Sequence, residues 1–484
     1  MTVDYKIDFT TFSNVINNEL TSTAKTRHAI NPSTEEALAE VPVATKADVE
    51  EVVKHARAAF PGWSDLSYDE RAKHLVALAD GLEANSQAFQ DLLVQESGKP
   101  AQTAAIEVAM SVGHLREISK LRIPEDVIED TEERTVVVRH IPLGVGCGIV
   151  PWNWPLLLGV GKVGSALLTG NTFIWKPSPF TPYSGLKLGE LAARILPPGV
   201  LQVVSGGDDL GPMLTDHPGV DKVSFTGSTF TGKKVMESCS RSLKRVTLEL
   251  GGNDPAIICD DVDLDKVVPK IGTFAFLNSG QICMDIKRIY VHENIYDRFR
   301  AALVDFTAKN VKTGPASDPD VLVGPIQNSM QYEKVKDMYA EIAKQGWNAA
   351  LGGAVHERNS STAKGYFVHP AIIDNPPDDS RIVVEEPFGP IVPLLKWRDE
   401  ADVVRRANDT KMGLGASVWS RDLDRAGRMA KKLEAGSVWV NTHFELAPNV
   451  PFGGHKWSGF GMEWGVVGMK GWCYTQSMWT RKEF

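Results

Sequence analysis

The chain of 484 residues contains five cysteines, and they are scattered: Cys147, Cys239, Cys259, Cys283 and Cys473. None belongs to a C-x-x-C pair, and no histidines lie beside them at the spacing of a zinc site. This pattern excludes a disulfide framework and gives no basis for a bound metal. We expect a reducing, cytoplasmic setting.

The sequence also lacks a cluster of basic residues. Its formal net charge is -9, so it offers no basic surface for a phosphate backbone, and we expect no nucleic acid partner. The first residues carry Asp4 and Asp8 where a secretory signal would need a basic stretch and an apolar run, which predicts no export.

One stretch, Ile141 to Gly161, has no charge and is long enough to span a bilayer. It contains three prolines and Asn153 between two tryptophans, which would be unfavourable in lipid. We therefore interpret it as buried core and expect no membrane partner. With 43% hydrophobic and 23% charged residues, the chain has the composition of a folded protein of two or three compact units.

The order of the elements predicts an α/β fold. Ser67 and Glu70 form a capping box before an amphipathic helix. From Gly144 onward, short apolar strands alternate with helices, which is typical of βαβ units in a doubly wound parallel sheet. Ligands of such sheets bind beyond the carboxyl ends of the strands, and polar residues or glycines follow three of the expected strands here: Lys176, Gly227 and Glu249.

A second series of strands and helices begins after Gly251. Two further β-prone segments, ERTVVVRHIPLG and GWCYTQSMW, look like strands outside the main sheet. They suit an oligomer contact, although edge strands of the same domain explain them equally well.

The sequence contains three glycine-rich segments that could bind a phosphate group or carry a catalytic residue. Gly159 to Gly164 matches G-x-G-x-x-G, but no strand directly precedes it and no acidic residue follows at the required distance, so a tightly packed helix is favoured. The segment from Gly227 to Lys234 resembles a phosphate loop but has Lys234 where the magnesium-binding hydroxyl should stand. It remains a strand-to-helix turn that can hold a pyrophosphate. The third, Leu250 to Asn253, follows Glu249, which is well placed for acid–base work.

Seven motifs in order, spread over nearly the whole chain, resemble the aldehyde dehydrogenase superfamily. They are PWNWP from Pro151, KPSPFTP from Lys176, FTGSTFTG from Phe225, LELGGNDP from Leu248, SGQIC ending at Cys283, EEPFGP from Glu385, and PFGGHKWSGFGMEWG from Pro451.

The resemblance implies a catalytic set. Cys283 would be the nucleophile that forms a thiohemiacetal and then a thioester, although a lone cysteine is more often a buried structural thiol. The side-chain amide of Asn153 and the backbone N–H of Cys283 would stabilise the oxyanion. Glu249 would be the general base, and Lys162 and Glu463 match positions of a proton path.

The resemblance also implies NAD as cofactor, with NADP possible. It places Lys176 on the adenosine ribose, Glu386 on the nicotinamide ribose and Phe388 near the nicotinamide. The other residues expected at this site are Trp152 and, on the pyrophosphate, Gly227, Ser228 and Gly232. Many relatives that prefer NAD carry a glutamate three residues after the lysine, whereas Pro179 stands here, so we expect weak discrimination against NADP.

For the aldehyde substrate, helical spacing after Pro151 projects Trp154, Leu158 and Gly161 from one face. Many relatives have a bulky aromatic residue at Gly161, so its absence predicts extra room for a medium or large apolar or aromatic aldehyde. The alternative is that a neighbouring element packs closely on the glycine. The remaining expected pocket residues are Phe444, Leu446 and Phe452.

The expected architecture is an aldehyde dehydrogenase fold with a doubly wound cofactor domain (1–120 and 143–250), a catalytic α/β domain (251–457) and a small β oligomerisation element (121–142 and 458–484). A homodimer or homotetramer is implied by the family. The sequence leaves two other functions open: a nucleotide-hydrolysing enzyme built on the phosphate loop, and a catalytically silent binding protein on the same fold.

Overall fold

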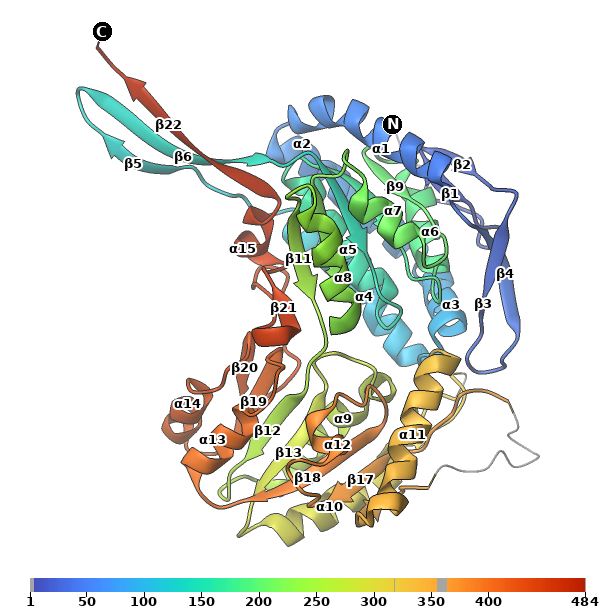
Figure 1. The fold of residues 1–484 in the computed structure, drawn as a ribbon, viewed down its shortest axis with the longest axis vertical. Coiled ribbons are helices and arrows are strands. Elements are labelled where there is room, and N and C mark those ends of the chain that lie inside the picture. Colours follow the sequence, from blue (N-terminus) through green and yellow to red (C-terminus); the bar gives the residue numbers. More distant parts are fainter. Residues whose placement is uncertain (1–3, 317, 355–363, 484) are drawn as a thin grey trace.

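The computed structural model describes residues 4–316, 318–354 and 364–483. They form two α/β units and a projecting arm (Figure 1). Among these residues, no helix is both long enough and apolar enough to cross a bilayer.

The first unit is built on an eight-stranded sheet. In spatial order its strands are β2 (Glu19–Thr21), β1 (Asn14–Ile16), β9 (Leu201–Val203), β8 (Thr172–Lys176), β7 (Val145–Ile149), β10 (Lys222–Thr226), β11 (Arg245–Glu249) and β21 (Gly459–Phe460). The five strands from β9 to β11 are parallel, and β1 and β21 pair antiparallel at the two sides. The helices of this unit are α1 (Lys46–Ser64), α2 (Tyr68–Ala84), α3 (Ser86–Ser97), α4 (Ala101–Ile118), α5 (Pro155–Leu168), α6 (Tyr183–Ala192), α7 (Leu210–Asp216) and α8 (Thr229–Ser240).

The second unit has a seven-stranded sheet. Its strands, in spatial order, are β16 (Ala349–Leu351), β17 (Ala371–Asp374), β18 (Ile391–Trp397), β13 (Ile286–His292), β12 (Asp254–Ile258), β19 (Gly415–Trp419) and β20 (Ser437–Val440). The helices are α9 (Leu264–Phe276), α10 (Tyr296–Asn310), α11 (Ser329–Gln345), α12 (Arg381–Val384), α13 (Glu400–Asn408) and α14 (Leu423–Ala430). Small two-stranded sheets pair β3 (Thr26–Ile30) with β4 (Ala37–Pro42) and β14 (Lys312–Thr313) with β15 (Val321–Val323).

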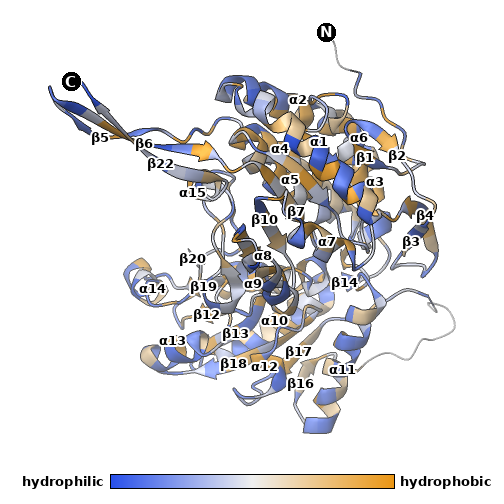
Figure 2. Cartoon of the chain, turned by 45° about the horizontal axis from the view of Figure 1, so that its top comes forward, coloured by the Kyte–Doolittle hydropathy of each residue, from blue (hydrophilic) through white to orange (hydrophobic). Residues whose placement is uncertain are grey.

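Hydropathy follows this layering. Most of the central strands of both sheets are buried along their whole length, as parallel strands covered on both faces require. Figure 2 shows hydrophilic and hydrophobic residues side by side along the surrounding helices, such as α1 and α11. The expected capping box is confirmed, because Ser67 and Glu70 exchange hydrogen bonds at the start of α2.

The arm is a three-stranded antiparallel sheet of β22 (Cys473–Arg481), β6 (Arg134–Pro142) and β5 (Asp126–Asp130). It extends away from both units (Figure 1), so the expectation of strands outside the main sheet is confirmed. One expected boundary differs, because residues after 458 do not all belong to the arm. Strand β21 closes the edge of the first sheet beside β11, and helix α15 (Gly465–Lys470) follows it before β22 begins.

The G-x-G-x-x-G segment is a packed helix, as the sequence favoured. It lies inside α5, where a Cβ on Gly159 would overlap the ring of Trp175 in β8, and a Cβ on Gly164 would touch Ile118 of α4 at 3.0 Å. These glycines allow α5 to approach the sheet and α4 closely.

We therefore predict that Gly159→Ala lowers the stability of the protein by about 1–3 kcal/mol, the usual effect of overpacking a filled core. Gly113→Ala in α4 is the matched control, because its Cβ would meet nothing within 4 Å. Thermal melting of both variants tests the packing, and equal melting temperatures would contradict it.

Candidate active site

The site begins where the order of the first sheet reverses. The chain passes from β7 to β8 and β9 on one side, and then returns to β10 and β11 on the other side of β7. Open α/β sheets bind ligands at this switch point, beyond the carboxyl ends of the strands. A cavity of about 190 Å³ lies there. It is lined by Pro151, Trp152, Asn153, Thr226, Gly227, Ser228, Leu250, Gly251, Cys283, Gln331, Lys334, Glu386 and Phe388.

Cys283 enters this cavity from the second unit, on the loop before β13. Three consecutive residues with left-handed backbone, Asn278 (φ 51°), Ser279 (φ 62°) and Gly280 (φ 70°), turn the chain into this loop. Gly280 also packs against the backbone of Gly389 so closely that no side chain fits. Burial raises the pKa of the Cys283 thiol, so the thiol needs a base before it can react.

Side chains from distant segments fix the backbone of the cysteine loop. The Asn153 amide donates to the carbonyl of Gln281 at 3.0 Å. The ring Nε2 of His443 lies 2.9 Å from the carbonyl of Met284 and donates to it, while Nδ1 faces the hydroxyl of Ser417. Burial lowers the pKa of His443 to about 4, which keeps the ring neutral. The loop is therefore held on both sides of Cys283.

The backbone around Asn153 is fixed by a buried ion pair of Lys99 and Glu107. Lys99 donates to the backbone carbonyl of Asn153 at 2.9 Å and pairs with Glu107. The same Glu107 accepts the N–H groups of Leu156 at 2.9 Å and Leu157 at 3.1 Å, which are free at the start of α5. These hydrogen bonds fix the position of Asn153 in the segment that follows β7.

Glu249 ends β11 and is buried, and neither carboxylate oxygen has a hydrogen-bond partner among the described residues. One oxygen would lie 3.2 Å from a Cβ at Gly453, so the glycine leaves it room. Burial raises the pKa of Glu249 well above the ordinary value and Glu463 adds to the rise, while Lys162 opposes it. A buried carboxyl without partners is suited to taking up and releasing a proton.

Lys162 and Glu463 form one buried group with Ser224 of β10. The Lys162 ammonium donates to the serine hydroxyl at 2.9 Å and to the Glu463 carboxylate at 3.0 Å, and the hydroxyl donates to the same carboxylate. The structure thus brings together two expected residues that are far apart in the sequence, and it adds Ser224, which no motif had indicated.

The opposite wall of the cavity holds the residues expected near the nicotinamide. Glu386 accepts the N–H of Gly252 at 3.2 Å, and its carboxylate fills the space that a side chain at Gly251 would need. The ring of Phe388 packs edge-on against Trp152, with 5.3 Å between centroids. Phe388 has a φ of 50°, and two hydrogen bonds of 3.0 Å from the Gln331 amide to residues 387 and 388 hold this backbone.

The turn after β10 corrects one expectation. Gly232 lies one turn inside α8, its N–H donates to the Ser228 carbonyl at 2.9 Å, and a Cβ there would meet Leu250 at 2.6 Å. It is a packing glycine and offers no group to a pyrophosphate. The N–H of Gly227 is also engaged, with the carbonyl of Glu249 at 3.0 Å. Ser228 caps α8 by accepting the N–H of Thr231 at 3.2 Å, which leaves the N–H groups of Thr229 and Phe230 at the helix start for an anion.

The phosphate-loop alternative gains no support. Lys233, which would reach the phosphates of a nucleoside triphosphate, lies over the ring of Trp457 at 3.6 Å from its centroid. Lys234 lies over Phe230 at 4.3 Å.

Lys176 lies at the end of β8, on the same edge of the sheet, but it does not line the cavity that holds Cys283. Its ammonium donates to the Pro177 carbonyl at 3.3 Å, and burial lowers its pKa to about 8. A ligand that touches both Lys176 and Cys283 must therefore be extended along this edge.

The expected substrate residues are brought together with Cys283 in one apolar cluster. Members expected from the sequence are Trp154, Leu158, Phe444, Leu446 and Phe452, and the cluster also contains Met110, Leu157, Leu277, Ile282, Met284, Leu414, Trp439 and Trp464. Extra room at Gly161 is not found, because Trp464 fills it: a Cβ on Gly161 would meet the indole nitrogen at 2.6 Å. Trp464 follows Glu463 in the last family motif, which was the only sequence signal for it.

Comparisons with known proteins agree with this geometry. Residues 20–478 match the model of the aldehyde dehydrogenase family. Aldehyde dehydrogenase LUC3 of Fusarium is 40% identical over 98% of this chain and 100% of its own length, and human retinaldehyde dehydrogenase 3 is 38% identical over 93% and 89%. The NAD⁺ complex of an aldehyde dehydrogenase from Bacillus cereus superposes with a TM-score of 0.93, at 35% identity, over 98% of this chain and 97% of that one.

The chain therefore belongs to the aldehyde dehydrogenase family. It is an NAD(P)-dependent enzyme that oxidises aldehydes. The residues present fit the cofactor: the start of α8 offers N–H groups, Gly251 makes room for the Glu386 carboxylate at the cavity, and Lys176 lies further along the edge.

The raised pKa of Glu249 predicts how the rate depends on pH. Only the carboxylate can take a proton, so kcat/KM should rise with pH through a range above the ordinary carboxyl pKa of about 4.3. Glu249→Gln should remove this rise and lower the rate by about 10²–10⁴, the contribution of a positioned base.

Initial rates at low aldehyde concentration, measured from pH 5 to 10, give kcat/KM and test this effect. The control is Glu293→Gln, which changes a carboxylate paired with Arg398 at the surface. A Glu249→Gln variant with the wild-type profile would show that this carboxyl is not the base.

Proposed function

We propose that the enzyme oxidises aldehydes with an apolar or aromatic body through a covalent intermediate on Cys283. The observation that carries the proposal is the position of Cys283, which lines the polar cavity on one side and packs against an aromatic cluster on the other. A cofactor and an aldehyde can thus approach the same sulfur from different sides.

In the proposed mechanism, Glu249 takes the thiol proton and the thiolate adds to the aldehyde carbon. A C–S bond forms, and the carbonyl π electrons move to the oxygen, which the Asn153 amide and the Cys283 N–H receive. The nicotinamide, when bound, would accept the hydride that the thiohemiacetal carbon loses as its C=O bond re-forms, which would leave a thioester on Cys283. Glu249 then activates a water that attacks the thioester, and the acid leaves as the C–S bond breaks. Lys162 and Glu463 carry the proton away from Glu249.

The substrate class rests on the aromatic walls. Phe444 stacks on Phe274 with a centroid distance of 6.1 Å and rings nearly parallel at 7°. Trp464 packs against Phe452 at 5.3 Å. Burying an apolar substrate against such surfaces contributes about 25 cal/mol per Å², which favours a larger aldehyde over acetaldehyde.

We further propose that the enzyme works as a homodimer or homotetramer in a cytoplasmic setting and that it accepts NADP beside NAD. Apolar side chains are exposed along the arm, including Val127, Ile128 and Trp479, and a partner chain would cover them. Pro179 remains the reason to expect weak discrimination against NADP.

Cys283→Ala should abolish aldehyde-dependent reduction of NAD while binding of NAD, measured by calorimetry, is kept. Cys473→Ala is the matched control, because Cys473 is also half-buried but lies in the arm. Turnover by Cys283→Ala would refute the covalent mechanism.

Phe444→Ala should lower kcat/KM for benzaldehyde by about tenfold, since burying an aromatic ring contributes about 1.5–3 kcal/mol when complete. Acetaldehyde is too small to gain from this wall and serves as the internal control. A wild-type preference for acetaldehyde, or equal losses for both substrates, would refute the substrate class.

A further inference from the structure

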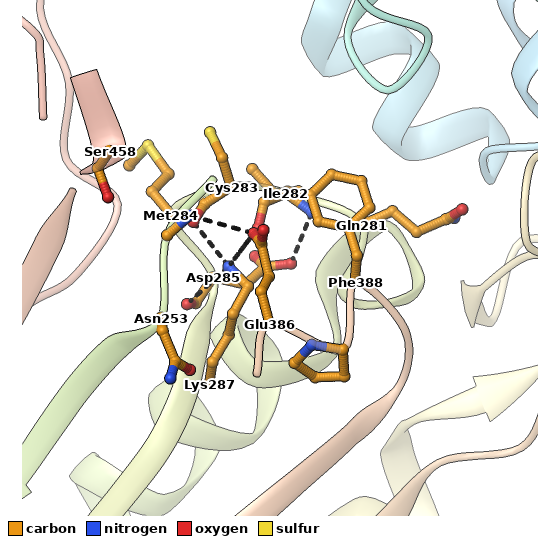
Figure 3. A network of polar contacts seen from close by, with 12 residues as sticks. Asn253, Gln281, Ile282, Cys283, Met284, Asp285, Lys287, Glu386, Phe388 and Ser458 are labelled. Carbon is orange, nitrogen blue, oxygen red and sulfur yellow. Dashed lines mark hydrogen bonds and ion pairs between the residues drawn. The ribbon is translucent and has the colours of Figure 1, made fainter. Parts of the chain in front are cut away.

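Lys287, on β13, lies directly behind the nucleophile. Its ammonium group is buried and donates to the carbonyls of Ile282 and Cys283, each at 2.7 Å. It also lies 3.5 Å from the carboxylate of Glu386. Figure 3 shows this network, with the Lys287 nitrogen on one side of the loop and the Cys283 sulfur pointing to the other.

The peptide group between Ile282 and Cys283 is therefore fixed at its oxygen. Besides the ammonium of Lys287, the Ile282 carbonyl accepts the N–H of Asp285 at 3.1 Å. The Asp285 carboxylate in turn accepts the N–H of Ile282 at 3.1 Å. The nitrogen of this same peptide group belongs to Cys283, and its N–H donates to no group among the described residues.

Lys287 is also the main positive charge of this region. Burial raises the pKa of Asp254 to about 7 and raises the pKa of Asp285, Glu386 and the Cys283 thiol, and at each of the four Lys287 is the largest opposing influence. A cation at this place was not indicated by any motif, and nothing in the reaction itself uses its proton.

A carbonyl that accepts a hydrogen bond from an ammonium group is polarised, and the N–H of the same peptide group becomes a stronger donor. Charge-assisted bonds are about twice as strong as neutral ones. Each bond in such a chain strengthens the next by roughly 10–30%. The effect is largest in a buried site, where water does not screen the charge.

We propose that Lys287 is a positioning residue that fixes and polarises the peptide group between Ile282 and Cys283, so that the Cys283 N–H is a strong donor to the substrate oxyanion. The inference rests on the covalent mechanism proposed above. When the C–S bond forms and the π electrons move to the aldehyde oxygen, this N–H faces the new charge. Lys287 touches neither the substrate nor the sulfur.

The test compares two reactions of the same thiolate. Alkylation by iodoacetamide forms a C–S bond with loss of iodide and creates no oxyanion. Acylation by p-nitrophenyl acetate, followed as the burst of p-nitrophenol without cofactor, passes through an oxyanion. Both reactions depend on the fraction of Cys283 that is thiolate, so this fraction cancels in the ratio of the acylation rate to the alkylation rate. Neither reaction uses the cofactor, so an effect of Lys287 on the cofactor through Glu386 does not enter the ratio.

In Lys287→Met the ratio should fall by about tenfold or more, since complete loss of one oxyanion donor lowers rates by about 10²–10³. Lys287→Gln removes the charge but keeps an amide donor, so its ratio should fall less. This variant replaces Lys287→Met in the test if Lys287→Met does not fold. The first-turnover burst of reduced cofactor with an aldehyde should fall in parallel.

Lys187→Met is the matched control, because Lys187 is an equally buried lysine in α6 that pairs with Glu190 away from the cavity. Its ratio should equal that of the wild type. An unchanged ratio in both Lys287 variants would overturn the inference, whether the two rates fall together or remain constant. A wild-type enzyme that oxidises no aldehyde would refute the proposed function instead, and the ratio would still be measurable.

Discussion

The site depends on one constraint, the fixed backbone of the loop that carries Cys283. A left-handed turn at residues 278–280 directs the chain into the cavity, and the carbonyls of residues 281 to 284 each accept a hydrogen bond from a side chain. Such a turn is unfavourable for residues other than glycine and persists only where the surroundings determine it. The donors come from both units, so the position of the sulfur depends on how the two units pack together.

The sequence could predict those parts of the site that follow from local order. Glu249 is the last residue of β11, and Ser228 lies two residues after β10. Parallel strands bring their carboxyl ends to one edge, so the proximity of these residues followed from the alternation of strands and helices. The packing of Gly159 inside a helix could also be predicted, because no strand directly precedes the glycines of the G-x-G-x-x-G segment.

Other parts depend on tertiary contacts that no local pattern contains. Gly161 gave an expectation of open space, but Trp464, from a different segment, occupies it. Gly232 matched a phosphate-binding motif, but Leu250 packs against it, so the glycine is needed for packing. Lys287 is close to Cys283 in sequence, but only the turn of the chain brings its ammonium group to the loop carbonyls.

The edge strand β21 and the segment after it have a consequence for the order in which the enzyme assembles. Glu463 and Trp464 complete contacts to Lys162 and Gly161, which lie in the first half of the chain. During synthesis on the ribosome, the strands β7 to β11 and Cys283 emerge before Glu463 and Trp464, so the buried group of Lys162, Ser224 and Glu463 cannot yet form. The nascent chain therefore carries Cys283 long before the contacts of Glu463 and Trp464 can be made, and these contacts form only with the last part of the polypeptide.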